Sequence, residues 1–298
     1  MSICTTHLNT AARSAISMQR AKTLPIAEQI QRFSDAYAKD ATVNGVSWRY
    51  YVFGAGSVIF MLPGGLRRAA YLFETMQQIA YRHAVIALDF PPVMSFDELV
   101  AGFDTILQAE GVDRCAVYGQ SYGGILAQAY AACRPDVVER LVLSSTRPAD
   151  YGRVWLPLEQ LAMLLVRVLP DRGLRQLLGV LLARVLTVPD AQRDEWRRAV
   201  YSTLENDLCH GDVVSHFAVM ADIIRRRIVH PEAFRAWRGH AIVLAAVNDR
   251  TQRRGDRARF EALFGRSVTT ITLGTLGHTA GLMDPGQYAE LVERALTC

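Results

Sequence analysis

Residues 117–124 read Val117-Tyr118-Gly119-Gln120-Ser121-Tyr122-Gly123-Gly124. An apolar run of strand length, Cys115–Tyr118, comes directly before the G-x-S-x-G pattern, and a helical pattern, Ile125–Cys133, follows it. A chain that turns from strand to helix within one residue strains the backbone of that residue, and its neighbours two positions away must lack a Cβ. Gly119 and Gly123 satisfy this requirement. The stretch therefore predicts a strand–turn–helix unit that presents Ser121 as a nucleophile.

The same turn predicts where negative charge would be stabilised. A helix that begins after Ser121 points its free N–H groups at the serine, so the backbone N–H of Tyr122 is a candidate oxyanion donor. A second donor is expected in the loop after the strand-like run Val58–Leu62, which reads Pro63-Gly64-Gly65-Leu66. We predict Gly65 as this donor. The residues expected beside the substrate are Gly64, Leu66 and Gln120.

A serine needs a base to remove its proton, and position along the chain selects that base. Of the seven histidines, only His278 follows the last strand-like run, in Gly277-His278-Thr279-Ala280-Gly281-Leu282-Met283-Asp284-Pro285. The others lie in the N-terminal region, before a strand, or in a helical stretch: His7, His83, His210, His216, His230 and His240. We therefore predict His278 as the general base.

The acid that orients the base is expected after a neighbouring strand. Asp249 follows the buried run Val243–Val247 and leaves room for one helix and one strand before His278. Asp256 is the alternative, but it lies where a helix begins. The other position that could supply an acid, after Leu141–Leu143, holds Ser144-Ser145-Thr146 and no carboxylate.

Apolar runs alternate with helix-length segments along most of the chain. The runs are Val58–Leu62, Ala84–Leu88, Cys115–Tyr118, Leu141–Leu143, Ala241–Val247 and Val268–Leu273. Short, fully apolar runs separated by helices indicate a mostly parallel sheet covered on both faces. We also expect a helix over residues 25–40 and a strand from Val43 to Phe53.

The alternation stops between residues 148 and 235, where only helical patterns occur, over 156–169, 172–187, 190–206 and 212–228. We expect this insertion to form an all-helical cap over the carboxyl ends of the strands. The predicted organisation is a tail at 1–24, a core formed by 25–147 and 236–298, and the cap at 148–235.

Composition excludes several classes of protein. The chain of 298 residues has a formal net charge of +4 with basic residues spread along its length, which argues against nucleic-acid binding. Five cysteines without metal-ligand spacing predict neither a disulfide framework nor a metal site. No apolar segment has the length of a membrane span. We expect a cytoplasmic protein without a cofactor; the sequence leaves homo-oligomer formation open.

From about residue 43 onward the chain resembles the α/β-hydrolase superfamily. The two most specific marks are the G-Q-S-Y-G-G turn at Ser121 and the G-H-T-A-G-L-M-D-P loop at His278. Residues 46–146 are also similar to the maspardin-like branch, in Trp48-Arg49-Tyr50-Tyr51, in Pro63-Gly64-Gly65 and in Leu88-Asp89-Phe90-Pro91-Pro92-Val93. That branch is associated with partner binding and with loss of hydrolytic activity, but here Ser121, Asp249 and His278 are all kept.

The resemblance implies a serine hydrolase that cleaves a carboxylic ester or a related acyl bond of a small apolar substrate. The epoxide hydrolases and haloalkane dehalogenases of this fold use an aspartate nucleophile, and Ser121 argues against both. Two alternatives stay open. One is a maspardin-like binding protein without catalysis; the other is a biosynthetic tailoring enzyme, such as a cyclase, thioesterase or acyl transferase.

Overall fold

A computed structural model describes residues 24–297, so the predicted tail lies almost wholly outside the described residues. Eight strands form one sheet in the order β1-β2-β4-β3-β5-β6-β7-β8, with β1, β2 and β4 paired antiparallel and the others parallel. The strands are β1 Ala38–Val43, β2 Val46–Gly54, β3 Val58–Leu62, β4 Ala84–Leu88, β5 Cys115–Gln120, β6 Val138–Ser144, β7 His240–Ala245 and β8 Thr269–Thr272. The predicted mostly parallel sheet is confirmed.

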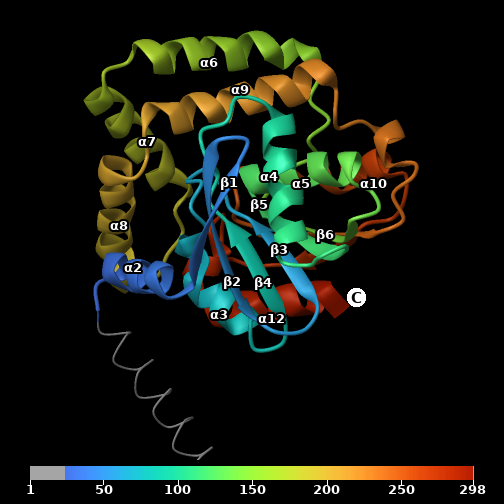
Figure 1. Cartoon of the computed structure of the whole chain (residues 1–298), viewed down its shortest axis with the longest axis horizontal. Coiled ribbons are helices and arrows are strands. Elements are labelled where there is room, and N and C mark those ends of the chain that lie inside the picture. The colour runs from blue at the N-terminus through green and yellow to red at the C-terminus, as the bar shows by residue number, and fades with distance from the viewer. Residues whose placement is uncertain (1–23, 298) are drawn as a thin grey trace, which may run out of the picture.

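Helices cover both faces of this sheet, as Figure 1 shows. Alternate strand residues enter two separate cores: Phe60 and Leu62 pack on one face, and Ile59 and Met61 on the other. This is why the central strands are apolar at every position. The helices that flank the sheet are α2 Ile26–Tyr37, α3 Phe73–Ile79, α4 Phe96–Ala109, α5 Tyr122–Cys133, α10 Asp256–Phe264, α11 Ala280–Met283 and α12 Pro285–Thr297.

The expected strand from Val43 to Phe53 is wrong in one respect. The chain forms a hairpin there, because Asn44 and Gly45 both adopt positive φ, at 50° and 80°, and reverse the chain between β1 and β2. Asn-Gly is a strong signal for a two-residue hairpin turn of this kind. The turn chemistry outweighs the strand propensity of its neighbours.

Between β6 and β7 the described chain contains helices and no strand. The four main helices are α6 Leu156–Val168, α7 Asp171–Val185, α8 Arg193–Asn206 and α9 His210–Arg226, which we call the cap helices. In Figure 1, α6 runs across the top of the molecule above α9. α9 is largely buried and adds Val219 and Ile223 to the main core, whereas α6 buries only Val166. None of the helices in residues 24–297 is long and apolar enough to cross a bilayer.

One close contact between a strand and a helix generates a prediction on stability. Gly102 lies inside α4, where alanine would ordinarily stabilise the helix. A Cβ at this position would, however, lie 2.0 Å from the buried ring of Trp48. Gly102→Ala should therefore lower the free energy of unfolding by about 1–3 kcal/mol, measured by urea titration.

Gly255→Ala is the matched control. A Cβ at Gly255 meets nothing within 4 Å, and the φ of this residue is −86°. Its free energy of unfolding should stay within about 0.5 kcal/mol of wild type. Equal stability of Gly102→Ala and wild type would contradict the packing described here.

Candidate active site

Ser121 lies at the junction of β5 and α5 with a strained backbone. Its φ is 52° and its ψ is −115°, an unusual conformation for a residue with a side chain. The glycines on both sides allow it: a Cβ at Gly119 would lie 2.4 Å from the carbonyl oxygen of Gly123, and a Cβ at Gly123 would lie 2.2 Å from that of Leu62. The expected reason for both glycines is thus confirmed.

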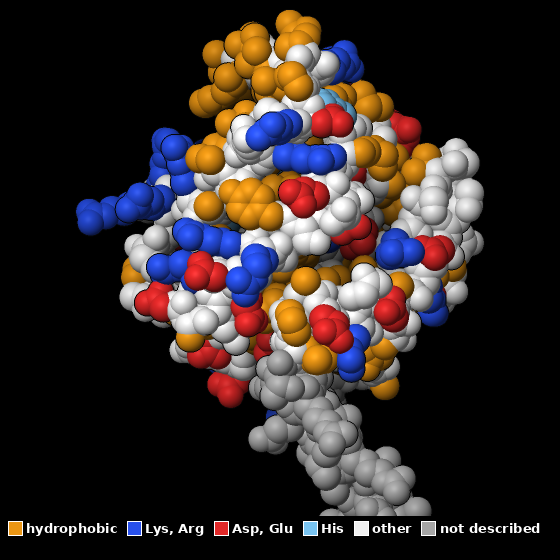
Figure 2. All heavy atoms as spheres, turned by 90° about the vertical axis from the view of Figure 1, so that its left-hand side faces the viewer, with side chains coloured by type: hydrophobic (Ala, Val, Ile, Leu, Met, Phe, Trp, Pro, Cys, Tyr) orange, Lys and Arg blue, Asp and Glu red, His pale blue; other side chains and the backbone are white. Residues whose placement is uncertain are grey.

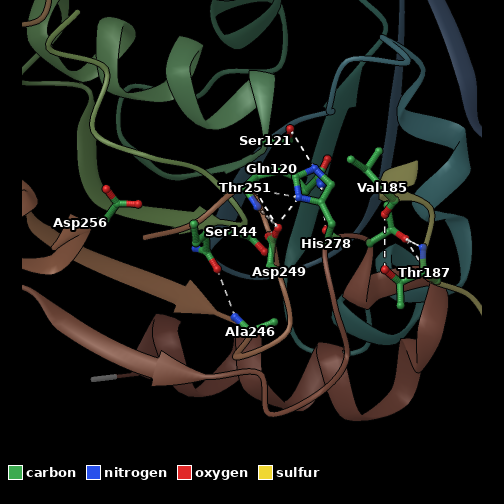
Figure 3. A network of polar contacts seen from close by, with 12 residues as sticks. Gln120, Ser121, Ser144, Val185, Thr187, Ala246, Asp249, Thr251, Asp256 and His278 are labelled. Carbon is green, nitrogen blue, oxygen red and sulfur yellow. Dashed lines mark hydrogen bonds and ion pairs between the residues drawn. The ribbon is translucent and has the colours of Figure 1, made fainter. Parts of the chain in front are cut away.

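The side chains of Ser121, His278 and Asp249 form one hydrogen-bonded chain, which Figure 3 shows. Nε2 of His278 lies 3.1 Å from Oγ of Ser121, and Nδ1 lies 3.0 Å from Oδ2 of Asp249. The three residues follow β5, β8 and β7, so the parallel sheet brings together positions up to 157 residues apart. Each lies at the carboxyl end of its strand.

Asp249 is held as a carboxylate. Burial alone would raise its pKa, but hydrogen bonds from His278 and Thr251, with the charge of His278, lower the pKa below its usual value. A carboxylate at Nδ1 fixes the imidazole so that Nε2 faces the serine as an acceptor.

Thr251 is a site residue that the sequence reasoning missed. Its hydroxyl donates to Oδ1 of Asp249 at 2.7 Å, its backbone N–H donates to the same oxygen at 2.9 Å, and its Oγ1 lies 3.1 Å from Nδ1 of His278. An aspartate whose side chain accepts from the residue two positions on is a common local turn. The Asp-x-Thr spacing was therefore the available signal.

Asp256, the alternative acid, belongs elsewhere. It forms an ion pair with Arg147 at 3.1 Å and accepts the backbone N–H of Arg253 at 2.8 Å, at the start of α10. Figure 3 shows its side chain apart from His278. The geometry thus joins Asp249, and not Asp256, to the histidine.

The loop after β3 approaches Ser121 from the other side. A Cβ at Gly64 would lie 2.1 Å from Oε1 of Gln120, so only glycine fits there without movement. Gln120 in turn donates from Nε2 to the carbonyl oxygen of His278 at 3.2 Å, which ties the histidine loop to β5. Gly65 and Ser121 border the same two cavities. The oxyanion role of Gly65 and Tyr122 stays a prediction.

Arg67 supports this loop from within the protein and was not expected. It is buried with a φ of 64°, and its Nη2 donates to the carbonyl oxygen of Pro91 at 2.7 Å and to Oγ of Ser215 at 3.0 Å. Its Nε lies 3.5 Å from Oδ1 of Asp212. Ser215 and Asp212 belong to α9, so a single guanidinium links the loop after β3 to the cap helices.

His216 of α9 packs over the residue that follows the nucleophile. Its ring stacks on that of Tyr122 with centroids 3.9 Å apart and an interplanar angle of 27°. Burial, together with the positive charge of Arg67, lowers the pKa of His216 to about 3. Sequence position alone gave His216 no role, because a cap helix contacts the core only through the tertiary fold.

Two cavities meet at Ser121. The smaller, of about 240 Å³, is walled by aliphatic side chains and borders His278. It also borders the three residues predicted beside the substrate, which are Gly64, Leu66 and Gln120. The larger, of about 760 Å³, is bordered by Tyr122, His216 and Glu159 among others. Burial raises the pKa of Glu159. Within residues 24–297 no group of three or more His, Cys, Asp or Glu is placed to hold a metal ion.

The neutral state of His216 predicts a pH dependence of stability. An unfolded histidine takes up a proton below about pH 6.5, whereas folded His216 does so only near pH 3. The contribution of neutral His216 to the free energy of unfolding is therefore complete above about pH 6.5 and is lost as the pH falls towards 3. When the pH falls from 7.5 to 5, the free energy of unfolding measured by urea titration should fall by about 1–2 kcal/mol less in His216→Phe than in wild type.

His240→Phe removes an exposed histidine and is the matched control for this measurement. Phenylalanine at 216 keeps a ring against Tyr122, so the two variants differ mainly in which imidazole they lack. Parallel pH curves for His216→Phe and wild type would show that His216 is not the residue responsible.

Comparisons with known proteins agree with this architecture. A family model described as alpha/beta hydrolase fold matches residues 58–195. A hydrolase from Pseudomonas aeruginosa PA01 has a TM-score of 0.70 at 17% identity, covering 88% of this chain and 98% of that chain. No curated protein sequence matches the chain.

Two further solved structures are similar at comparable levels. The enol-lactonase from Burkholderia xenovorans LB400 has a TM-score of 0.66 at 18% identity, covering 87% of this chain and 100% of that chain. The meta-cleavage product hydrolase from Pseudomonas fluorescens IP01 has a TM-score of 0.65 at 19% identity, covering 88% and 98%. The maspardin-like resemblance stays a prediction. The fold expected from the Ser121 turn is confirmed: residues 58–195 match the alpha/beta hydrolase family model, and the chain has the α/β-hydrolase fold.

Proposed function

We propose that the protein is a serine hydrolase that cleaves a carboxylic ester, or a related acyl bond, of a small apolar substrate. The observation that carries this proposal is the unbroken hydrogen-bonded chain from Ser121 through His278 to Asp249. A serine is a weak nucleophile unless a base accepts its proton, and this chain supplies a base already oriented by a carboxylate.

The reaction would proceed in two halves. Oγ of Ser121 attacks the substrate carbonyl while Nε2 of His278 takes the serine proton, and the carbonyl oxygen becomes an oxyanion. The backbone N–H groups of Tyr122 and Gly65 stabilise this oxyanion, and His278 returns the proton to the departing alcohol. Water activated by His278 then cleaves the acyl-enzyme, which releases the acid and regenerates Ser121.

The side chains that line the two cavities favour an apolar acyl group. The smaller cavity is bordered by the aliphatic side chains of Leu66, Leu182, Leu186 and Val200, and Arg68 is the only arginine, lysine or acid among residues 24–297 that lines it. The larger cavity carries Arg147, Arg253, Arg259, Asp150 and Glu159 and suits a more polar leaving group. We assign the acyl side to the smaller cavity for this reason.

A fluorophosphonate probe tests the nucleophile. Such probes phosphonylate a serine only when a base activates it, so wild type should be labelled at one site per chain. Ser121→Ala should lose the label and at least about a thousandfold in esterase activity. Intact-mass spectrometry and hydrolysis of p-nitrophenyl butyrate measure the two effects.

Ser202→Ala, which removes an exposed serine of α8, should label and hydrolyse as wild type does. Absence of labelling in folded wild type at high probe concentration would overturn the proposal. The maspardin-like binding function without catalysis would then be the better explanation.

The volume of the smaller cavity predicts the preferred acyl length. A cavity of about 240 Å³ is smaller than the roughly 300–1,000 Å³ of pockets for drug-sized ligands, so it favours acyl groups of short to medium length. Across p-nitrophenyl esters of increasing length, kcat/KM should peak for acyl groups of about four to eight carbons. Leu182→Ala enlarges the cavity and should move the peak to longer chains.

Leu181→Ala is the matched control, because Leu181 lies next to Leu182 on α7 but is exposed and does not border the cavity. Its profile should match that of wild type. An unchanged profile in Leu182→Ala would place the acyl group elsewhere.

A further inference from the structure

The outer face of α6 carries a row of exposed aliphatic side chains. The row follows a spacing of four and three residues, which places its members on one side of a helix. Each member is at least half exposed: Val154 in the short turn just before α6, and Leu158, Leu161, Leu165 and Val168 on α6 itself. Exposed apolar groups in a continuous row mark a surface that contacts something other than water. We call this row the α6 stripe.

α7 has an exposed apolar face as well. Leu177, Val180 and Leu181 are nearly half exposed or more, and Arg184 lies on the same side, four residues after Val180. Figure 2 shows hydrophobic side chains gathered over the top of the molecule, where Figure 1 places α6, with Lys and Arg side chains on its flank. The exposed surface thus spans two consecutive cap helices.

The charges around the α6 stripe have one sign. Arg153, Arg167, Arg172 and Arg184 are exposed, and none of them forms an ion pair or side-chain hydrogen bond within residues 24–297. The two acids of α6 and α7 are engaged differently. Glu159 is partly buried beside the larger cavity, and Asp171 forms an ion pair with His210.

This charge pattern distinguishes between the partners that could cover the stripe. A second copy of the chain packed face to face would bring unpaired arginines together with no exposed free carboxylate on α6 or α7 to neutralise them. A lipid surface with anionic headgroups would accept the arginines at headgroup level while the aliphatic side chains enter the acyl boundary. We propose that α6 and α7 dock the protein on an anionic lipid surface.

The docking surface is continuous with the cavities at Ser121. Trp155 and Leu158 border the larger cavity, and Leu182 and Val185 of α7 border the smaller one. An amphiphilic substrate leaving the lipid would therefore meet the cavities along the same two helices. The docking itself goes beyond the proposed hydrolysis and does not need it, so Ser121→Ala should bind lipid as wild type does.

The protein contains its own fluorescent reporter for this interaction. Trp155, beside the stripe, is half exposed, whereas Trp48, Trp196 and Trp237 are at most 2% exposed. Vesicles of phosphatidylcholine with about a third phosphatidylglycerol should shift the emission of the full chain to the blue and sediment with it. Pure phosphatidylcholine vesicles should bind about tenfold less, and salt should weaken the anionic binding. Trp155→Phe should lose most of the shift.

Paired variants separate the two contributions. Leu161→Asp with Leu165→Asp should weaken binding to both vesicle types by about a hundredfold. Arg167→Gln with Arg184→Gln should weaken binding to the anionic vesicles by about tenfold and leave pure phosphatidylcholine unaffected. Tyr81→Asp changes an exposed aromatic residue outside the cap, in the turn before β4, and is the matched control.

All of these positions, including Trp155, carry exposed side chains. Unchanged circular dichroism and Tm would show that the variants fold. Failure of folded wild type to sediment with anionic vesicles would overturn the proposal. So would concentration-dependent dimers in analytical ultracentrifugation that Leu161→Asp with Leu165→Asp abolishes, because the stripe would then bind a second copy. Failure of the serine assay alone would leave the docking result standing.

Discussion

The strained backbone of Ser121 is the constraint on which the rest of the site depends. A residue with a side chain at φ 52° costs about 1–3 kcal/mol, and it persists only where its surroundings fix it. The surroundings here are specific. The N–H of Ser121 donates to the carbonyl oxygen of Ser144 at 2.9 Å, and Gly123 lies against the backbone of Leu62. The turn is therefore stable only when β5 lies between β3 and β6.

That strand order also explains how distant residues become one site. The loops after β3, β5, β7 and β8 all leave the same edge of the sheet, because these strands are parallel. The glycines at 64 and 65, the serine, the aspartate and the histidine each come from one of these loops. Gln120 adds a direct tie between two of them by holding the backbone of His278. Contacts between neighbouring loops therefore help to hold each loop in place.

Features that depend on local sequence patterns could be predicted from the sequence, whereas features that depend on packing between distant elements could not. The ends of β3 and β4 were predicted residue by residue, since local apolar patterns determine them. Ser121, His278 and Asp249 could be predicted to lie together because each follows a strand of the sheet. The roles of Arg67 and His216 were not predicted, because the contacts that give them these roles, Arg67 with Ser215 and His216 with Tyr122, join α9 to residues more than 90 positions away. Only packing of α9 on the core gives them a role.

The cap helices are attached to the core unequally. α9 shares the main hydrophobic core and the Arg67 contacts, and α8 holds Tyr71 through Thr203 and the carbonyl oxygen of Ala199. The buried apolar side chains of α6 and α7 belong instead to a small separate cluster of Val166, Leu174, Val213 and Val214, and only partly buried side chains of the two helices reach the main cores. Segments with few buried apolar contacts open at lower free energy than the core does. Because α6 borders the larger cavity and α7 borders the smaller one, the part of the cap nearest the substrate path is the part that needs least free energy to move.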